Sequence, residues 1–164
     1  MTFAESLIAE LKHESGLTRK MLERAPFDKR EWRPHERSMS LGRLVTHIAE
    51  IPHWIPQILE NDSFDFAGRP YQPHTASSPE ELMEIFRANI DSSVAALEKA
   101  AAEDFDKIWV VKRGEQVIYQ VLKQVAIRGW AFSHLFHHRG QLSVYLRLLD
   151  VPVPGMYGPS ADER

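Results

Sequence analysis

The histidines are the residues of this sequence whose type and spacing could do chemistry, and there are eight of them. His134 and His138 stand four residues apart, a spacing that puts two side chains on one helix face with Cβ atoms about 5–6 Å apart. Imidazole nitrogens bind a divalent ion at ~2.0–2.1 Å, so such a pair can share one ion with a third histidine from a facing helix. Three neutral imidazoles would leave a coordination position open, and an open site can lower the pKa of a bound water to ~7.

The helix faces on which the histidines fall identify the third candidate ligand. At about 100° per residue, His47 falls on the apolar side of its helix, whereas His53 falls on the opposite side and should face water. His134 and His138 straddle the centre of the apolar stripe of the later helix, and His137 lies at its margin. We therefore predict that His47, His134 and His138 are the metal ligands and that His137 is a weaker candidate.

The alternative is that these are core histidines that hydrogen-bond to backbone carbonyls. Three inward-facing histidines on two helices would then need three separate polar partners in one core, and each unmet partner costs free energy. Spacing alone favours the metal only slightly, because histidine pairs four residues apart also occur without any ligand role.

Other residues near these faces could assist. Trp54 and Trp130 could line a substrate pocket, although simple core packing is the favoured interpretation for both. Gln141 and Tyr145 follow the histidine pair and could orient an imidazole or bond a water; Tyr145 could equally be a buried ring with a satisfied hydroxyl. Glu14 could be a carboxylate behind the ligands or a general base, but a solvated position at the rim is favoured.

Four segments with helical periodicity must position these residues. The second contains Pro52 and Pro56, which predict a kink or an early end because proline lacks a backbone donor. The third has the clearest start, since Ser78 can cap it, Pro79 suits its first position and Glu81 completes a capping box. The predicted helices span about 2–24, 38 or 40 to 60, 78–101 and 121–149.

The connections complete the predicted architecture. A long crossover loop, 61–77, joins the second and third helices, and 27–37 is a connecting loop. Segments 108–111 and 117–119 could form a short hairpin or simply an extended connection before the last helix. We therefore predict an all-α four-helix bundle that forms one domain over residues 1–164.

Composition excludes several classes of protein. The chain has no cysteine, so a disulfide, a thiolate metal site and a cysteine nucleophile are all excluded. Its net charge of −3 and scattered basic residues argue against nucleic acid and anionic membranes as partners. No apolar run approaches the ~20 residues of a membrane span, and the first residues do not resemble a signal peptide. We expect a cytoplasmic protein.

Three motifs resemble the DinB-like family, and they occur in order along the whole chain. They are HLFHHRGQL at 134–142, LVTHIAE at 44–50 and VPGMYGPS at 153–160. The resemblance implies a four-helix bundle, often a homodimer, with a three-histidine site for one divalent ion, zinc or nickel being the first expectation. Some relatives look like thiol-dependent transferases that use bacillithiol or mycothiol, and others like metal-dependent hydrolases.

These observations support one leading hypothesis and two alternatives. The leading hypothesis is a metal-dependent hydrolase or thiol-dependent transferase that acts on a small molecule, with a low-molecular-weight thiol as one candidate. The first alternative is a non-catalytic metal-containing binding or structural protein, whose ion should be closed off by a fourth protein ligand. The second, a damage-response factor on nucleic acid, is disfavoured by the net charge of −3.

Overall fold

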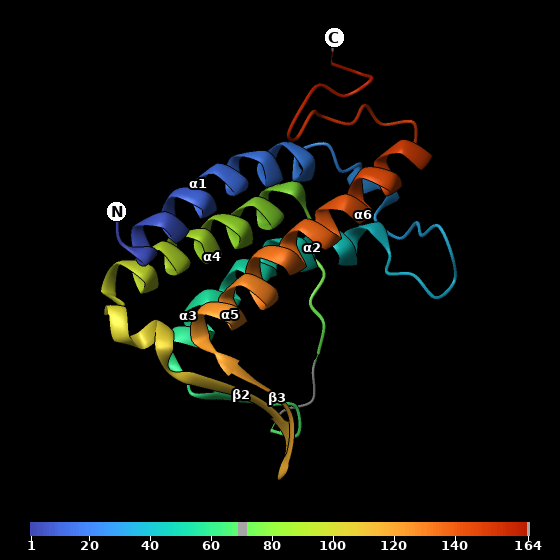
Figure 1. Cartoon of the computed structure of the whole chain (residues 1–164). Coiled ribbons are helices and arrows are strands. Elements are labelled where there is room, and N and C mark those ends of the chain that lie inside the picture. The colour runs from blue at the N-terminus through green and yellow to red at the C-terminus, as the bar shows by residue number, and fades with distance from the viewer. Residues whose placement is uncertain (69–71, 164) are drawn as a thin grey trace.

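Three helices of this protein begin where a side chain accepts from a free backbone N–H group of the first turn. A computed structural model describes residues 1–68 and 72–163 (Figure 1). Helix α1 (Phe3–Leu22) starts with a capping box in which the Thr2 hydroxyl accepts from the Glu5 N–H at 3.2 Å and the Glu5 carboxylate accepts from the Thr2 N–H at 2.7 Å. The helical periodicity predicted this helix, and the capping box is an additional finding.

Helix α4 (Pro79–Lys99) starts where it was predicted to start. The Ser78 hydroxyl accepts from the Glu81 N–H at 3.2 Å, and Pro79 is the first helical residue. The reciprocal half of the predicted box is wrong, because the Glu81 carboxylate accepts from the N–H of Ser77 at 2.7 Å instead. The cap is therefore extended by one residue toward the preceding loop.

The proline-rich second segment is broken, as predicted. Helix α2 (Leu41–Glu50) follows the Ser40 cap, a 3₁₀ turn (Ile51–His53) carries Pro52, and helix α3 (Trp54–Glu60) resumes with Pro56 in its first turn, where no N–H is needed. Because Pro56 has no N–H for the carbonyl four residues earlier, the Ser93 hydroxyl of α4 donates to the Pro52 carbonyl at 2.7 Å.

The last predicted helix, 121–149, is a continuous helical run from Lys123 to Leu148; its predicted start is wrong because residues 121 and 122 belong to a strand, and its middle is a π-helix. Helix α5 (Lys123–Ala126) leads into the π segment (Ile127–Ser133), which leads into α6 (His134–Leu148). A π turn bonds i to i+5 and holds more residues than an α turn, so face angles at 100° per residue do not carry across it. Both histidines of the pair lie within α6, where the spacing argument holds.

A small sheet corrects the all-α prediction. The sheet has the strand order β1 (Ser63–Asp65), β2 (Ile108–Arg113) and β3 (Gln116–Leu122). Strand β1 pairs with β2 in parallel, and β3 pairs with β2 antiparallel. The hairpin alternative is thus confirmed, and its turn uses Gly114 at a φ of 61°. The three-residue strand β1 lies inside the segment that was predicted to be a loop. The sheet lies at one end of the bundle (Figure 1).

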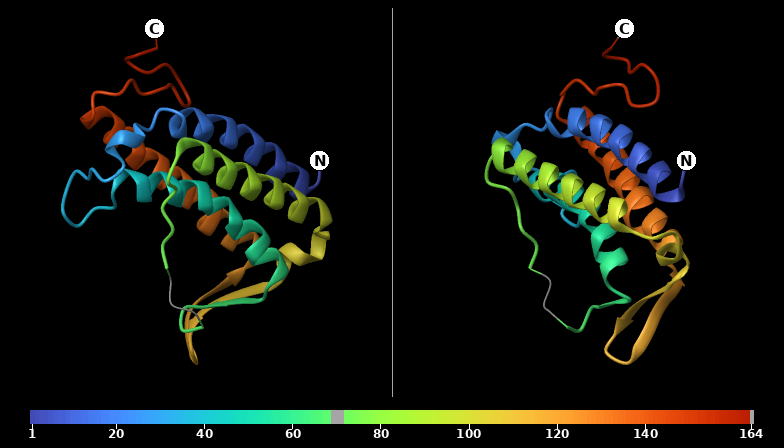
Figure 2. Two further views of the ribbon diagram at one scale, coloured as in Figure 1. Left: turned by 180° about the vertical axis from the view of Figure 1, so that it is seen from behind. Right: turned by 90° about the vertical axis from the view of Figure 1, so that its left-hand side faces the viewer.

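The helices pack through two apolar clusters. Helices α1 and α4 lie side by side on one side of the bundle, and α2 packs between α4 and α6 (Figure 2). No helix among the described residues is both long and apolar enough to cross a membrane. One cluster joins α2 to α6 and includes Leu44, Ile48, Leu135, Leu142 and Leu146; the other lies nearer the sheet and includes Leu7, Leu11, Ile55, Trp109 and Phe132. Short 3₁₀ turns (Phe27–Lys29 and Ala102–Asp106) complete the connections.

Candidate metal centre

The three predicted ligands come together between α2 and α6. Each offers one ring nitrogen, and these nitrogens all lie within 4.8 Å of one another. The ring centroid of His47 lies 4.9 Å from that of His134 and 4.6 Å from that of His138. The two rings of the α6 pair are 4.8 Å apart. His53 and His137 are exposed, as the face argument predicted for His53, and neither belongs to this group.

The spacing of the facing nitrogens fits a shared ion. His47 Nε2 lies 3.1 Å from His134 Nε2. Two nitrogens that bind one ion at ~2.0–2.1 Å, at angles between octahedral and tetrahedral, are roughly 2.9–3.4 Å apart. The His47–His134 pair therefore already has the separation that a common ion requires. A nitrogen of His138 at the 4.8 Å limit would have to move inward by roughly 1.4–1.9 Å to share that ion.

The second ring nitrogens are held by fixed partners. His138 Nδ1 lies 2.7 Å from the side-chain oxygen of Gln141, and His134 Nδ1 lies 3.3 Å from the carbonyl oxygen of Trp130. Both partners are acceptors, so each Nδ1 carries the proton and each Nε2 presents its lone pair. Gln141 thus orients an imidazole, which is one of the two roles expected for it.

The π segment explains why the Trp130 carbonyl is available to His134. In an α-helix the His134 N–H would bond to the carbonyl four residues earlier, which belongs to Trp130. Here that N–H bonds to the carbonyls of Gly129 and Ala131. The change of register leaves the Trp130 oxygen to accept from the imidazole, and it thereby fixes the tautomer of His134.

The surroundings keep the α6 histidines neutral. Burial lowers the pKa of His134, and the neighbouring His47 acts in the same direction. Burial also lowers the pKa of His138 to about 4, against the opposing effect of the hydrogen bond that its Nδ1–H donates to Gln141. The His138 side chain is only 9% exposed. The neutral imidazole is the form that binds a metal ion.

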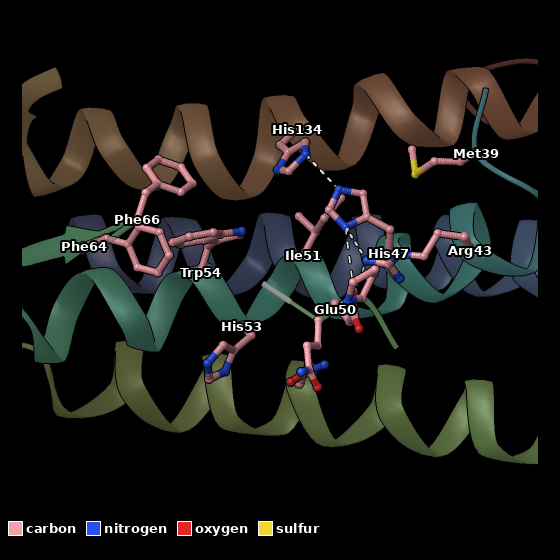
Figure 3. Close-up of a pocket in the computed structure, with 13 residues that line it drawn as sticks. Met39, Arg43, His47, Glu50, Ile51, His53, Trp54, Phe64, Phe66 and His134 are labelled. Carbon is pink, nitrogen blue, oxygen red and sulfur yellow. Dashed lines mark hydrogen bonds and ion pairs between the residues drawn. The ribbon is translucent and has the colours of Figure 1, made fainter. Parts of the chain in front are cut away.

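A cleft of about 1040 Å³ opens beside His47 and His134 (Figure 3). Such a volume matches the size of small-molecule sites. Its wall includes apolar and aromatic side chains together with a few polar groups. The lining residues are Met39, Arg43, His47, Glu50, Ile51, His53, Trp54, Phe64, Phe66, Gln72, Pro73, Asn89 and His134.

Glu50 is the functional candidate that the sequence analysis missed. Its carboxylate oxygen Oε2 lies 3.8 Å from His47 Nδ1 and 2.7 Å from Arg43 Nη2, at the edge of the cleft. Burial raises the pKa of Glu50, but the nearby His47 ring and the hydrogen bond and charge of Arg43 outweigh burial and lower the pKa below its ordinary value. Glu50 could have been identified from the sequence by its spacing from His47, because residues three apart share a helix face.

Tyr145 and Glu14, the other two polar candidates, both have partners in the fold. Tyr145 is the buried ring with a satisfied hydroxyl, since its O–H donates to the Met39 carbonyl at 3.0 Å. Glu14 is not at the solvated rim: it is 5% exposed and pairs with Arg139 at 2.7 Å. The hydroxyl of the exposed Tyr157 donates to the same carboxylate at 2.9 Å, so the buried Glu14–Arg139 pair is tied to the C-terminal tail as well as joining α1 to α6.

The two tryptophans take different places. Trp54 lines the cleft, as the pocket interpretation held, while its ring centroid lies 4.8 Å from that of Trp130 in an edge-to-face contact. Trp130 is partly buried and packs against the second core cluster. Core packing therefore describes Trp130, and both interpretations describe Trp54.

The fold and the histidine site together define a member of the DinB family, to which this chain belongs: the family model matches residues 1–164. Among curated proteins it is similar to the uncharacterized protein YjoA of Bacillus subtilis strain 168, with 24% identity over 149 residues that cover 90% of this chain and 91% of that protein.

Two crystal structures of DinB-like proteins share the fold. The structure of YjoA from Bacillus subtilis matches with a TM-score of 0.68 and 21% identity, covering 97% of this chain and 99% of that one. A DinB-like protein from Bacillus cereus matches with a TM-score of 0.70 and 22% identity, covering 93% and 97% respectively. The predicted family and its helical core are thus confirmed, with the sheet as an addition.

Proposed function

We propose that this protein is a metal-dependent enzyme, a hydrolase or a thiol-dependent transferase, that acts on a small molecule at the histidine triad. The observation that supports catalysis over a structural role is the cleft of about 1040 Å³ next to two of the three histidines. Within residues 1–68 and 72–163, the group of candidate ligands contains three histidines and no fourth ligand that would close the site.

Each residue of the site has a separate role in this proposal. His47, His134 and His138 would hold one divalent ion, zinc or nickel, which when bound makes a neighbouring O–H or S–H group more acidic. Trp130 and Gln141 orient two of the imidazoles from behind. The ring nitrogens that face inward are then fixed before any ligand arrives.

Glu50 supplies the proton acceptor. In hydrolysis and in thiol transfer alike, the nucleophile loses a proton as its oxygen or sulfur bonds to the substrate, and the leaving group departs with the electron pair of the broken bond. Glu50 Oε2 lines the cleft and can take that proton. Arg43, 2.7 Å away, holds the carboxylate in place and compensates its charge.

Cobalt substitution tests the proposal, because the absorption of bound cobalt changes when an exogenous ligand binds. Titration with azide and with 2-mercaptoethanol should shift the spectrum saturably, and the thiol should bind more tightly if the transferase assignment is correct. A spectrum insensitive to both, together with a fourth protein side chain on the ion, would establish the non-catalytic structural role instead. His53→Ala is the matched control, since this histidine lines the cleft outside the triad.

We also propose a homodimer in the cytoplasm, as the family resemblance and the composition lead us to expect. Light scattering coupled to size-exclusion chromatography measures the mass directly. A mass near 18.9 kDa, that of one chain, would contradict the dimer.

A further inference from the structure

The cleft has a second feature that the metal centre does not use, an aromatic wall formed by Trp54, Phe64 and Phe66. We propose that this wall is a binding subsite for an aromatic ring of the substrate. The substrate class that follows is a small molecule that joins such a ring to a polar group able to reach the histidine triad. This inference rests on the proposed function, whose site it extends.

The wall is rigid because its rings brace one another. Trp54 makes edge-to-face contacts with Phe64 at 5.0 Å and with Trp130 at 4.8 Å between ring centroids. Phe64 in turn makes an edge-to-face contact with Phe66 at 5.1 Å. Contacts of this kind set ring orientation as well as burying area. An aromatic surface that is ordered before binding loses little conformational freedom when a ligand docks.

The small sheet is what brings the phenylalanines to the cleft. Phe64 pairs with Val111 of β2 in the parallel ladder, and the N–H of Phe66 bonds to the Lys112 carbonyl at 2.9 Å. The Phe64 ring therefore contacts Trp54, while Phe66, in the turn that follows the strand, contacts Phe64 and has its ring centroid 6.5 Å from that of Trp130. The Asp65 carboxylate, between the two phenylalanines, instead accepts a hydrogen bond from the N–H of Gly114 in the hairpin turn at 2.9 Å.

Phe66 is exposed where a core residue would be covered. It is 45% exposed although it lines a concave wall and touches other rings. Exposed apolar surface with a polar rim is typical of ligand-binding grooves. The remaining face of the ring is therefore available to a ligand that enters the cleft.

The arrangement of the wall relative to the histidines restricts the ligand further. Figure 3 shows Trp54, Phe64 and Phe66 on one side of His134 and His47, with Arg43 and Met39 on the other. A ligand that stacks on the aromatic wall thus extends toward the triad and the Arg43–Glu50 pair. A polar group attached to the ring through a short link would reach the histidines.

Two hydroxamic acids with the same head group test the subsite on zinc-loaded protein. Acetohydroxamic acid carries only the metal-binding group, and phenylacetohydroxamic acid adds a ring beyond a methylene. Calorimetry should show at least tenfold tighter binding for the phenyl compound, a difference of about 1.4 kcal/mol. Phe66→Ala should remove this gain and leave acetohydroxamic acid binding unchanged. Phe3→Ala is the matched control, because Phe3 is 38% exposed and lies outside the cleft.

A metal-free arm separates the subsite from the proposed function. Binding of 2-naphthol to protein stripped of metal should be saturable by calorimetry and weakened at least fivefold in Phe66→Ala and Phe66→Leu. If neither hydroxamic acid binds but 2-naphthol binds in this way, the proposed function fails and the subsite stands. If acetohydroxamic acid binds, the phenyl group adds nothing and 2-naphthol does not saturate, the subsite is overturned and the metal centre stands.

Discussion

At the scale of single residues, the candidate centre depends on which nitrogen of each imidazole faces inward. His134 and His138 each direct Nδ1 to an acceptor, so their Nε2 atoms converge on the space that His47 Nε2 also faces. Three unrelated core histidines would not need to converge. His47 Nε2 and His134 Nε2 are at hydrogen-bond distance, 3.1 Å, which is also the separation of two ligands of one ion; the convergence of the third ring, His138, on the same group is what favours a shared ligand.

Metal content should depend on the triad alone. Alanine at His47, His134 or His138 removes one of three ligands, so affinity for zinc or nickel should fall by more than about 100-fold, which is the upper range for loss of a partner behind a ligand. His53→Ala and His13→Ala are controls on exposed helix faces and should keep stoichiometric metal. The measurement is elemental analysis of protein purified without a histidine tag. Full retention in His138→Ala with loss in His137→Ala would show that the neighbouring histidine is the ligand.

Metal affinity should fall as the pH falls, because protons compete for the ligand nitrogens. Three ordinary imidazoles with pKa values of ~6.5 would lose about a thousandfold per pH unit below that value. The lowered pKa values of His134 and His138, about 4 for the latter, keep these two ligands neutral to lower pH. The loss between about pH 6.5 and 5 should therefore be clearly smaller than a thousandfold per unit. Competition with a fluorescent zinc chelator measures it, and a profile that stays flat down to about pH 4 would contradict histidine ligation.

At the scale of elements, the sequence predicts whatever local chemistry specifies. Ser78 and Pro79 predict the start of α4, and Pro52 predicts the break after α2. Strand β1 has only three residues, and its order comes from pairing with β2, which lies far along the chain. The π register before His134 likewise has no local pattern that distinguishes it from an α-helix. The three-stranded sheet and the π segment could not be predicted for this reason. The aromatic wall depends on the sheet, and the tautomer of His134 depends on the π segment, so these two features could not be predicted either.

The break after α2 should be held by α4. Ser93 is fully buried, and its hydroxyl oxygen lies 2.7 Å from both the Pro52 and the Asn89 carbonyl oxygens, which share its single proton. Ser93→Ala leaves the Pro52 oxygen with one partner fewer, so the free energy of unfolding should fall by about 1–3 kcal/mol. Urea denaturation followed by circular dichroism measures the change. Ser92→Ala, one position along on the exposed face of α4, is the control and should stay within about 0.5 kcal/mol.

At the scale of the whole molecule, the candidate metal centre brings together parts of the chain that are distant in sequence. His47 and His134 are separated by 87 positions, and their helices share one apolar cluster that includes Leu44 and Leu142. The convergence of the ligands therefore requires the folded bundle and is lost when it unfolds. An ion that binds only the folded state stabilises that state by mass action.

Thermal unfolding should consequently report the integrity of the site. At a free zinc concentration about 100 times the Kd, the free energy of unfolding should rise by about 2.7 kcal/mol, which corresponds to roughly 5–10 °C in Tm for a chain of this length. Removal of the ion with a chelator should reverse the rise. His138→Ala should show no such rise, whereas His53→Ala should behave like the unchanged protein, because His53 lies outside the triad. Calorimetric scans with and without zinc measure this. An equal rise in all single variants of the triad would mean that the ion binds elsewhere, and it would remove the link between the bundle and the candidate centre.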